Sequence, residues 1–208
     1  MNRVLNLSVG KLVRALMAGR AGRLPLAVLV LGAGGFSALA LGPDVVAGPA
    51  QGASAQYELA GRVVRVSDGD TFNVLVQGRQ QRVRMASIDA PEVTKDKERP
   101  GQPYAQASRD ALASLISGKD LVLVCYERDR YERNICDVPL ADGMTANQKQ
   151  VENGMAWANM EGRGKFMRDA RLPSLEQQAR RAGRGIWRQP EPVPPWVWRY
   201  QCWQQQQC

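Results

Sequence analysis

Three short segments rich in β-branched residues, with roughly alternating apolar and polar positions, follow one another early in the chain. They span Gly61–Val66, Thr71–Val76 and Gln81–Met85. Turn-forming residues separate them, with Asp-Gly at 68–69 in the first gap and Gln-Gly at 77–78 in the second. Alternation with period two, interrupted by tight turns, is typical of paired antiparallel strands. The sequence therefore predicts a three-stranded meander around which the rest of the domain must pack.

The segments that follow the meander alternate between helical and strand patterns. Apolar or small residues at helical spacing predict a helix over 102–117, which ends at Gly118. Two β-branched segments predict a second hairpin, and two later stretches with helical spacing predict two more helices; these four segments are 121–126, 134–140, 145–158 and 173–182. The pattern predicts an α+β domain in which a five-stranded barrel is accompanied by three helices.

An uncharged stretch of 18 residues, Leu24–Leu41, follows a basic N-terminal segment. Its length is long for the core of a signal peptide and just sufficient for a transmembrane helix. Two interpretations of residues 1–41 therefore stay open, a cleaved signal peptide and an uncleaved anchor in the inner membrane. Both place the domain outside the cytoplasm, in the periplasm or secreted. The Gly-, Ala- and Pro-rich residues 42–57 indicate a linker.

The chain contains no histidine, and this absence excludes several kinds of active site. Serine–histidine triads and histidine-ligated zinc are excluded, so a general acid or base must be a carboxylate, Lys, Tyr or metal-bound water. A metal ion would be held by oxygen ligands, as Ca²⁺, Mg²⁺ and Mn²⁺ are. The net charge of +8 suggests a polyanionic partner, but residues 56–208 hold 23 basic and 19 acidic residues and are only mildly basic.

Three charged motifs lie next to the predicted strand ends. They are Asp68-Gly-Asp-Thr71, a segment in which Arg84 is followed by Asp89-Ala-Pro-Glu92, and Asp129-Arg-Tyr-Glu-Arg133. Each motif alone has an ordinary structural explanation as a turn, a strand exit or a solvated surface. In this order and spacing, and with Gly-Ile-Trp at 185–187, they resemble the thermonuclease (staphylococcal nuclease-like) family. The resemblance covers about residues 58–188.

The resemblance implies an OB-type barrel with three helices and a Ca²⁺ site. The metal ligands would be Asp70, Asp89 and the backbone carbonyl of Ala90, where the family usually has Thr. Glu92 would act as the general base on a water molecule. Carboxylate and carbonyl oxygens are the ligands that Ca²⁺ prefers, and a carboxylate base suits a chain without histidine.

The resemblance also assigns the phosphate-binding residues. Arg84 and Arg133 would hold the phosphodiester and stabilise the charge of its transition state, for which the planar guanidinium is suited. Arg130 and Tyr131 match positions that contact the nucleotide and its terminal phosphate. Glu132 departs from the pattern, because the family usually has Gly there. A Gly at that position suggests a turn with positive φ, which Glu resists.

The four cysteines divide into two pairs. Cys125 and Cys136 fall opposite each other on the second predicted hairpin, within reach of a disulfide that an exported protein would keep. Two buried free thiols are the alternative. Cys202 and Cys208 lie in the Pro-, Trp- and Gln-rich segment 189–208, which we expect outside the core; whether they pair stays open.

The functional hypothesis is an exported, Ca²⁺-dependent nuclease that hydrolyses DNA or RNA, with a preference for single strands along one face of the barrel. The expected state is a monomer without an obligate protein partner. A second hypothesis is a weakly active or inactive barrel that binds nucleic acid or protein in the cell envelope. A third assigns the function to the anchor and the C-terminal segment, with the barrel as scaffold. Retention of both arginines and all three carboxylates favours the enzyme.

Overall fold

The computed structural model describes residues 56–208. The predicted export segment, Leu24–Leu41, and almost all of the predicted linker lie outside the described residues. Within residues 56–208, no helix is long and apolar enough to cross a membrane.

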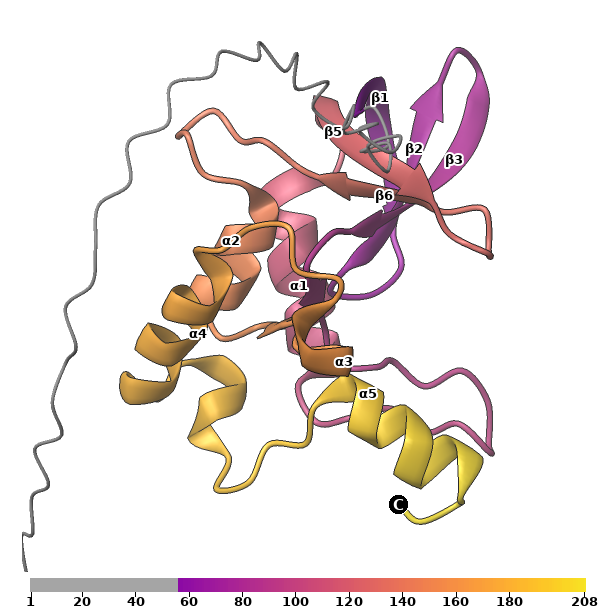
Figure 1. The fold of residues 1–208 in the computed structure, drawn as a ribbon. Coiled ribbons are helices and arrows are strands. Elements are labelled where there is room, and N and C mark those ends of the chain that lie inside the picture. Colours follow the sequence, from indigo (N-terminus) through magenta and orange to yellow (C-terminus); the bar gives the residue numbers. More distant parts are fainter. Residues whose placement is uncertain (1–55) are drawn as a thin grey trace, which may run out of the picture. The chain divides into compact units, whose positions relative to one another are not determined.

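A closed five-stranded barrel forms the centre of the domain (Figure 1). Its strands are β1 (Tyr57–Val66), β2 (Thr71–Val76), β3 (Arg79–Met85), β5 (Asp120–Arg128) and β6 (Asn134–Asp137). They pair in the order β1-β2-β3-β6-β5, and β5 returns to β1 to close the barrel. All pairs are antiparallel except β3 with β6. The predicted meander and the five-stranded barrel are thus confirmed.

The three predicted helices are present in the predicted order, but one of them is shorter than predicted and several short helical turns were not predicted. Three helices fall within predicted segments or one residue from them: α1 (Ala105–Ile116), α2 (Ala146–Glu152) and α4 (Leu172–Arg181). The helix predicted over 145–158 is wrong beyond residue 152. Gly154 follows with a φ of +67°, and a side chain there would meet the carbonyl of Arg184. The chain therefore turns sharply and cannot continue the helix.

Residues after this turn form a second, very small sheet. β7 (Trp157–Ala158) pairs antiparallel with β4 (Ile88–Asp89), outside the barrel. Short helical turns follow at α3 (Glu161–Gly164), Gly185–Arg188, α5 (Pro195–Trp198) and Arg199–Gln204. The pairing of β4 with β7 matters for the site because it fixes the position of Asp89, which lies opposite Trp157.

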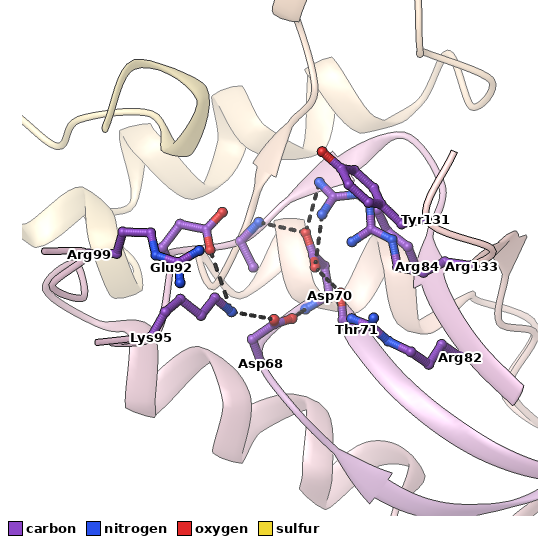
Figure 2. Close-up of a pocket in the computed structure, with 11 residues that line it drawn as sticks. Asp68, Asp70, Thr71, Arg82, Arg84, Glu92, Lys95, Arg99, Tyr131 and Arg133 are labelled. Atoms are coloured by element: carbon purple, nitrogen blue, oxygen red, sulfur yellow. Dashed lines mark hydrogen bonds and ion pairs between the residues drawn. The ribbon is translucent and has the colours of Figure 1, made fainter. Parts of the chain in front are cut away.

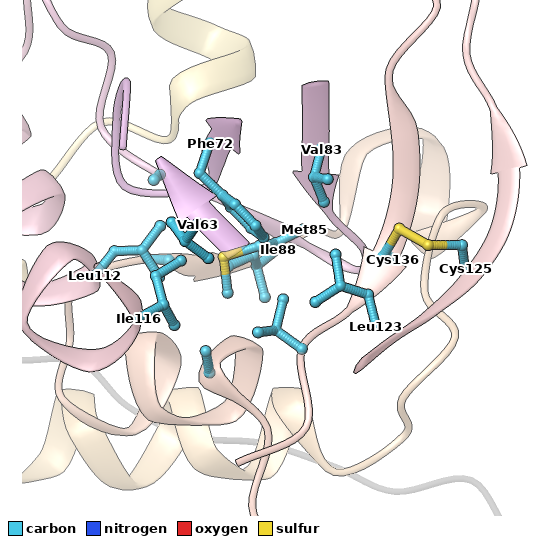
Figure 3. Close-up of a cluster of buried hydrophobic side chains, with 14 of the residues drawn as sticks. Val63, Phe72, Val83, Met85, Ile88, Leu112, Ile116, Leu123, Cys125 and Cys136 are labelled. Atoms are coloured by element: carbon cyan, nitrogen blue, oxygen red, sulfur yellow. A yellow bond between two sulfur atoms is a disulfide. The ribbon is translucent and has the colours of Figure 1, made fainter. Parts of the chain in front are cut away.

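The hydrophobic core fills the barrel and the space between the barrel and α1 (Figure 3). Phe72, Met85 and Leu123 point inward from the barrel strands, and Leu112 and Ile116 meet them from α1. All five side chains are fully buried or nearly so. Their burial supplies the main stabilising free energy of a domain of this size, so the rim of the barrel can carry polar residues.

Both cysteine pairs are oxidised. Cys125 on β5 and Cys136 on β6 are directly opposed in the ladder and form a buried disulfide. Cys202 and Cys208 form a second disulfide near the C-terminus. No cysteine of the chain is left as a free thiol. Two disulfides are typical of a domain that works outside the cytoplasm.

The C-terminal tail, residues 189–208, contributes no residue to the hydrophobic core cluster. It nevertheless packs against the loop between β4 and α1, where the indole N–H groups of Trp198 and Trp203 both donate to the carbonyl of Pro100, at 3.1 and 2.8 Å. Cys202 is buried in this contact region. The α5 turn accordingly runs alongside that loop in Figure 1.

Candidate active site

The loop between β1 and β2 places Asp70 at the rim of the barrel. Gly69 is required there because α1 approaches closely: a Cβ at this position would lie 1.8 Å from Oγ of Ser108. The buried amide of Gln150 donates to the carbonyl of Gly69 at 2.8 Å and holds the loop from the other side. Asp70 then accepts a hydrogen bond from the hydroxyl of Thr71 at 2.8 Å. The Asp-Gly-Asp-Thr motif thus combines a close packing requirement with a fixed carboxylate.

Arg84 reaches the site because of the register between β2 and β3. It lies opposite Thr71 in the ladder, and the amide of Met85 donates to the carbonyl of Asp70 at 2.8 Å. Its guanidinium lies 3.2 Å from Oδ2 of Asp70 and 2.7 Å from Oδ1 of Asp89. One arginine therefore bridges the two carboxylates that the resemblance assigns to the metal.

Asp89, Ala90 and Glu92 enter the site as the chain leaves β4. The backbone N–H of Ala90 donates to Oδ2 of Asp70 at 3.2 Å, so this segment lies directly against the β1–β2 loop. The backbone N–H of Glu92 donates to the side-chain carbonyl of Gln102 at 3.0 Å, which fixes the start of the following loop.

The turn between β5 and β6 contributes Arg133 and Tyr131. Asp129 organises it by accepting from the backbone N–H groups of Tyr131 and Arg133, at 2.9 and 3.0 Å, and from Nε of Arg133 at 2.7 Å. The guanidinium groups of Arg130 and Arg133 lie 4.9 and 5.4 Å from the ring centre of Tyr131. The side chain of Tyr131 is exposed. Parallel pairing of β6 with β3 brings this turn beside Arg84.

These elements enclose one pocket of about 340 Å³ at the barrel rim (Figure 2). Figure 2 shows Arg84, Arg133 and Tyr131 on one side of Asp70, with Glu92, Lys95 and Arg99 on the other. Of the residues singled out from the sequence, Asp70, Arg84, Ala90, Glu92, Tyr131 and Arg133 line the pocket. Asp89 pairs with Arg84 and its side chain is 1% exposed, and neither Asp89 nor Arg130 is among the lining residues.

The three carboxylates differ in their electrostatic surroundings. Burial raises the pKa of Asp70 to about 7, although Arg84 opposes this shift. Burial would also raise the pKa of Asp89, but the guanidinium groups of Arg84 and Arg199 outweigh it and hold that pKa below its ordinary value. Burial raises the pKa of Glu92, against the opposing effect of Arg199.

Several basic residues around the pocket were not predicted from the sequence. Arg82, Lys95 and Arg99 line it, and Lys95 lies 3.6 Å from Oδ2 of Asp68. Arg199, from the C-terminal tail, donates to both Asp89 and Glu92. Lys95 and Arg99 follow Glu92 closely in sequence, and this proximity could have indicated that they lie near the pocket. No sequence pattern links Arg199 to the site.

Comparison with known proteins finds a family match and several similar proteins. The family model described as staphylococcal nuclease homologue matches residues 82–189. A protein of Escherichia coli O157:H7 named "Uncharacterized endonuclease" is 40% identical over 143 residues, which cover 69% of this chain and 86% of the relative. The micrococcal nuclease of Shigella flexneri is 39% identical over 150 residues, covering 68% and 81%. Protein ParB of Escherichia coli is 37% identical over 172 residues, covering 78% and 89%.

The closed five-stranded barrel, the packed helices and the charged pocket at the rim define an OB-like α+β barrel protein. The chain belongs to the staphylococcal nuclease family. The resemblance inferred from the three motifs is therefore confirmed at the level of the family. The family match ends at residue 189, so nearly all of the C-terminal tail lies beyond it.

Glu132, in the turn between β5 and β6, has the backbone conformation that favours glycine. Its φ is +59°, and its side chain makes only an exposed ion pair with Arg128 at 3.7 Å. We expect Glu132→Gly to raise the free energy of unfolding by about 1 kcal/mol, since the left-handed conformation costs a non-glycine residue roughly that amount. Chemical denaturation measures this change, with Glu127→Gly on the neighbouring strand as a control expected to destabilise. A less stable Glu132→Gly variant would show that the turn is not strained.

Proposed function

We propose that this protein is an exported, Ca²⁺-dependent nuclease that hydrolyses phosphodiester bonds in DNA, RNA or both. One observation carries the proposal: Arg84, Glu92 and Arg133 converge on the pocket that Asp70 and Ala90 also line. Phosphodiester hydrolysis needs a proton acceptor for the attacking water and positive charge around the phosphate. The pocket supplies both from residues that come from four separate parts of the chain.

The oxygen donors that line the pocket or lie directly beside it fit a hard divalent cation. Asp70, Asp89 and the carbonyl of Ala90 offer oxygen donors, and all the cysteines are committed to disulfides. Within residues 56–208, no three acidic, Cys or His side chains alone form a metal cluster. The proposed donor set combines two carboxylates with the backbone carbonyl of Ala90. Bound there, Ca²⁺ would neutralise phosphate charge and orient the attacking water.

Glu92 is the proposed general base. Its side chain is 12% exposed and lines the pocket, so the carboxylate can contact a bound water while remaining partly desolvated. Burial raises its pKa, which strengthens it as a proton acceptor but also narrows the pH range in which it is ionised. Activity should therefore fall as the pH drops through this raised value, because the base becomes protonated.

Arg84 and Arg133 are the proposed phosphate-binding residues. Their side chains are 18% and 17% exposed, and each is oriented by a carboxylate, Asp70 and Asp129 respectively. Such orientation lets a guanidinium present its remaining N–H groups in a fixed geometry. Arg130 and the exposed ring of Tyr131 extend the surface from the same turn, where the ring is available to stack on a base.

The sequence and the disulfides together support a proposal for the cellular location of the protein and for the division of its chain into segments. Residues 1–41 would serve as signal peptide or membrane anchor, residues 42–57 as linker, and residues 58–188 as the nuclease domain. The two disulfides support a site of action in the periplasm or outside the cell. Single-stranded nucleic acid is the proposed preferred substrate, and the protein would act as a monomer.

The first test of this function is the metal dependence of hydrolysis. The purified protein is expected to degrade single-stranded DNA or RNA in Ca²⁺ and to stop in excess chelator, because the phosphate charge is then left without its metal partner. Readdition of Ca²⁺ should restore the rate. Release of acid-soluble nucleotides measures the activity. Full activity in excess chelator would remove the metal from the mechanism.

The second test replaces the guanidinium of Arg133 while keeping its charge. Arg133→Lys is expected to lower kcat by about 100- to 1,000-fold, because Lys cannot donate to two phosphate oxygens in a planar fork. Arg128→Lys is the matched control, since Arg128 precedes the same turn but does not line the pocket. Single-turnover rates compare the variants. A near-normal rate for Arg133→Lys would show that this residue does not contact the transition state.

The third test concerns Glu92. Glu92→Gln keeps the size of the side chain but cannot accept a proton, so we expect kcat to fall by about 100- to 10,000-fold. Ca²⁺ affinity measured by calorimetry should not fall by more than about tenfold. If weaker Ca²⁺ binding accounts for the whole loss, Glu92 is a ligand. If kcat does not change, the base lies elsewhere.

A further inference from the structure

Arg199 of the C-terminal tail occupies the carboxylates of the proposed metal and base site. Its Nη2 lies 2.8 Å from Oδ2 of Asp89, and its Nη1 lies 3.1 Å from Oδ1 of the same carboxylate. The same Nη1 also donates to Oε1 of Glu92 at 2.7 Å. A residue 110 positions away in sequence thus binds both the proposed ligand and the proposed base.

The tail is held by the loop that follows Glu92. Trp198 and Trp203 share the carbonyl of Pro100, and Gln102 donates to the carbonyl of Val193 at 2.9 Å. Gln102 also accepts from the backbone N–H of Glu92, so it joins the tail to the base through one amide side chain. The tail therefore docks on the side of the pocket where Glu92 lies.

The other half of the pocket is not engaged by these contacts. Arg133 and Tyr131 line the pocket from the β5–β6 turn, and within the described part of the chain no hydrogen bond or ion pair joins them to residues 189–208. The tail thus pairs with Asp89 and Glu92 and leaves Arg133 accessible. Such a contact would impede the binding of the metal ion and of the attacking water, but it would not cover the surface around Arg133 and Tyr131 where the substrate is proposed to bind.

The guanidinium of Arg199 competes with any metal ion for the oxygens of Asp89. The side chain of Asp89 is 1% exposed, so its charge must be compensated from within the protein. Arg84 provides part of that compensation, and Arg199 adds to it through two N–H donors. Ca²⁺ would take the place of Arg199 through direct ligation. Arg84 already lies 2.7 Å from Oδ1 of Asp89, so with Arg199 in place both oxygens of this carboxylate are paired with guanidinium N–H groups. A further cation adds strong repulsion in a partly desolvated site unless Arg199 leaves.

We propose that the C-terminal tail is an autoinhibitory segment in which Arg199 competes with Ca²⁺ for Asp89 and occupies Glu92. This inference rests on the proposed function of the pocket. With the tail docked, the metal site is closed and the base is paired; with the tail released, both become available. The apparent affinity for Ca²⁺ is then the intrinsic affinity reduced by the fraction of molecules whose tail is open. The tail therefore sets the Ca²⁺ concentration at which the enzyme becomes active.

The test compares Ca²⁺ binding by the full protein with that of two neighbouring tail variants. Arg199→Gln removes the charge that occupies the site, and calorimetry is expected to show Ca²⁺ binding about 10- to 100-fold tighter than in the parent. Tyr200→Gln is the matched control, because Tyr200 is the next residue and its side chain is 55% exposed. It should bind Ca²⁺ as the parent does.

Hydrogen–deuterium exchange gives a readout independent of catalysis. In the parent, Ca²⁺ should accelerate exchange in residues 195–208, since coupling between two competing ligands is reciprocal. In Arg199→Gln the same residues should exchange fast even in chelator. Trp203→Phe keeps Arg199 but removes one donor to Pro100, and it should tighten Ca²⁺ binding by a smaller factor. This variant keeps the proposal testable if Arg199→Gln folds poorly.

The outcomes separate this proposal from the function on which it rests. If parent and Arg199→Gln bind Ca²⁺ equally while the enzyme remains Ca²⁺-dependent, autoinhibition is wrong and the proposed function stands. If neither the parent nor any variant binds Ca²⁺, the proposed role of the metal is wrong, and the proposed autoinhibition is wrong as well. If Arg199→Gln lowers kcat at saturating Ca²⁺, Arg199 acts on the substrate and the tail is not inhibitory. The proposal is supported if Arg199→Gln hydrolyses nucleic acid faster than the parent at limiting Ca²⁺ and equally fast at saturating Ca²⁺.

Discussion

The bridge that Arg84 makes between Asp70 and Asp89 is the interaction on which the barrel rim and the pocket both depend. The two carboxylates come from different parts of the fold, the β1–β2 loop and strand β4, and both are almost fully buried. Two buried like charges repel unless a cation lies between them. The position of Arg84 is set by its pairing opposite Thr71. The register of β2 with β3 therefore determines where β4 can lie.

The barrel was predictable because its signals are local. Alternating residues and tight turns give strands 71–76 and 121–126 nearly as observed, and the opposed positions of Cys125 and Cys136 follow from the length of their hairpin. The end of α2 was not predictable from spacing. It depends on Gly154, whose backbone contacts residue 184, and such a long-range contact leaves no periodic signal.

The site also contains both predictable and unpredictable residues. Some stand in sequence motifs, and others reach the site only through tertiary packing. Asp70, Arg84 and Glu92 stand in recognisable motifs, and the fold brings them together. Arg199 stands in a Trp-rich segment with no motif, and it reaches Asp89 only because Trp198 and Trp203 find a carbonyl acceptor on a distant loop. Indole N–H groups need a hydrogen-bond partner when they are covered, but sequence does not reveal which partner they find.

The two bridged carboxylates affect stability in opposite directions. The pKa of Asp70 rises from 3.8 to about 7, so between those values the folded protein keeps a proton that the unfolded chain releases, and stability falls as the pH rises through this window. The pKa of Asp89 is lowered by two guanidinium groups, so its contribution is present above its ordinary pKa and is lost at lower pH. Arg199 thus compensates Asp89 while Asp70 shares only Arg84. A cation bound at Asp70 after release of the tail would add the positive charge that this carboxylate lacks, and its binding would stabilise the fold by mass action.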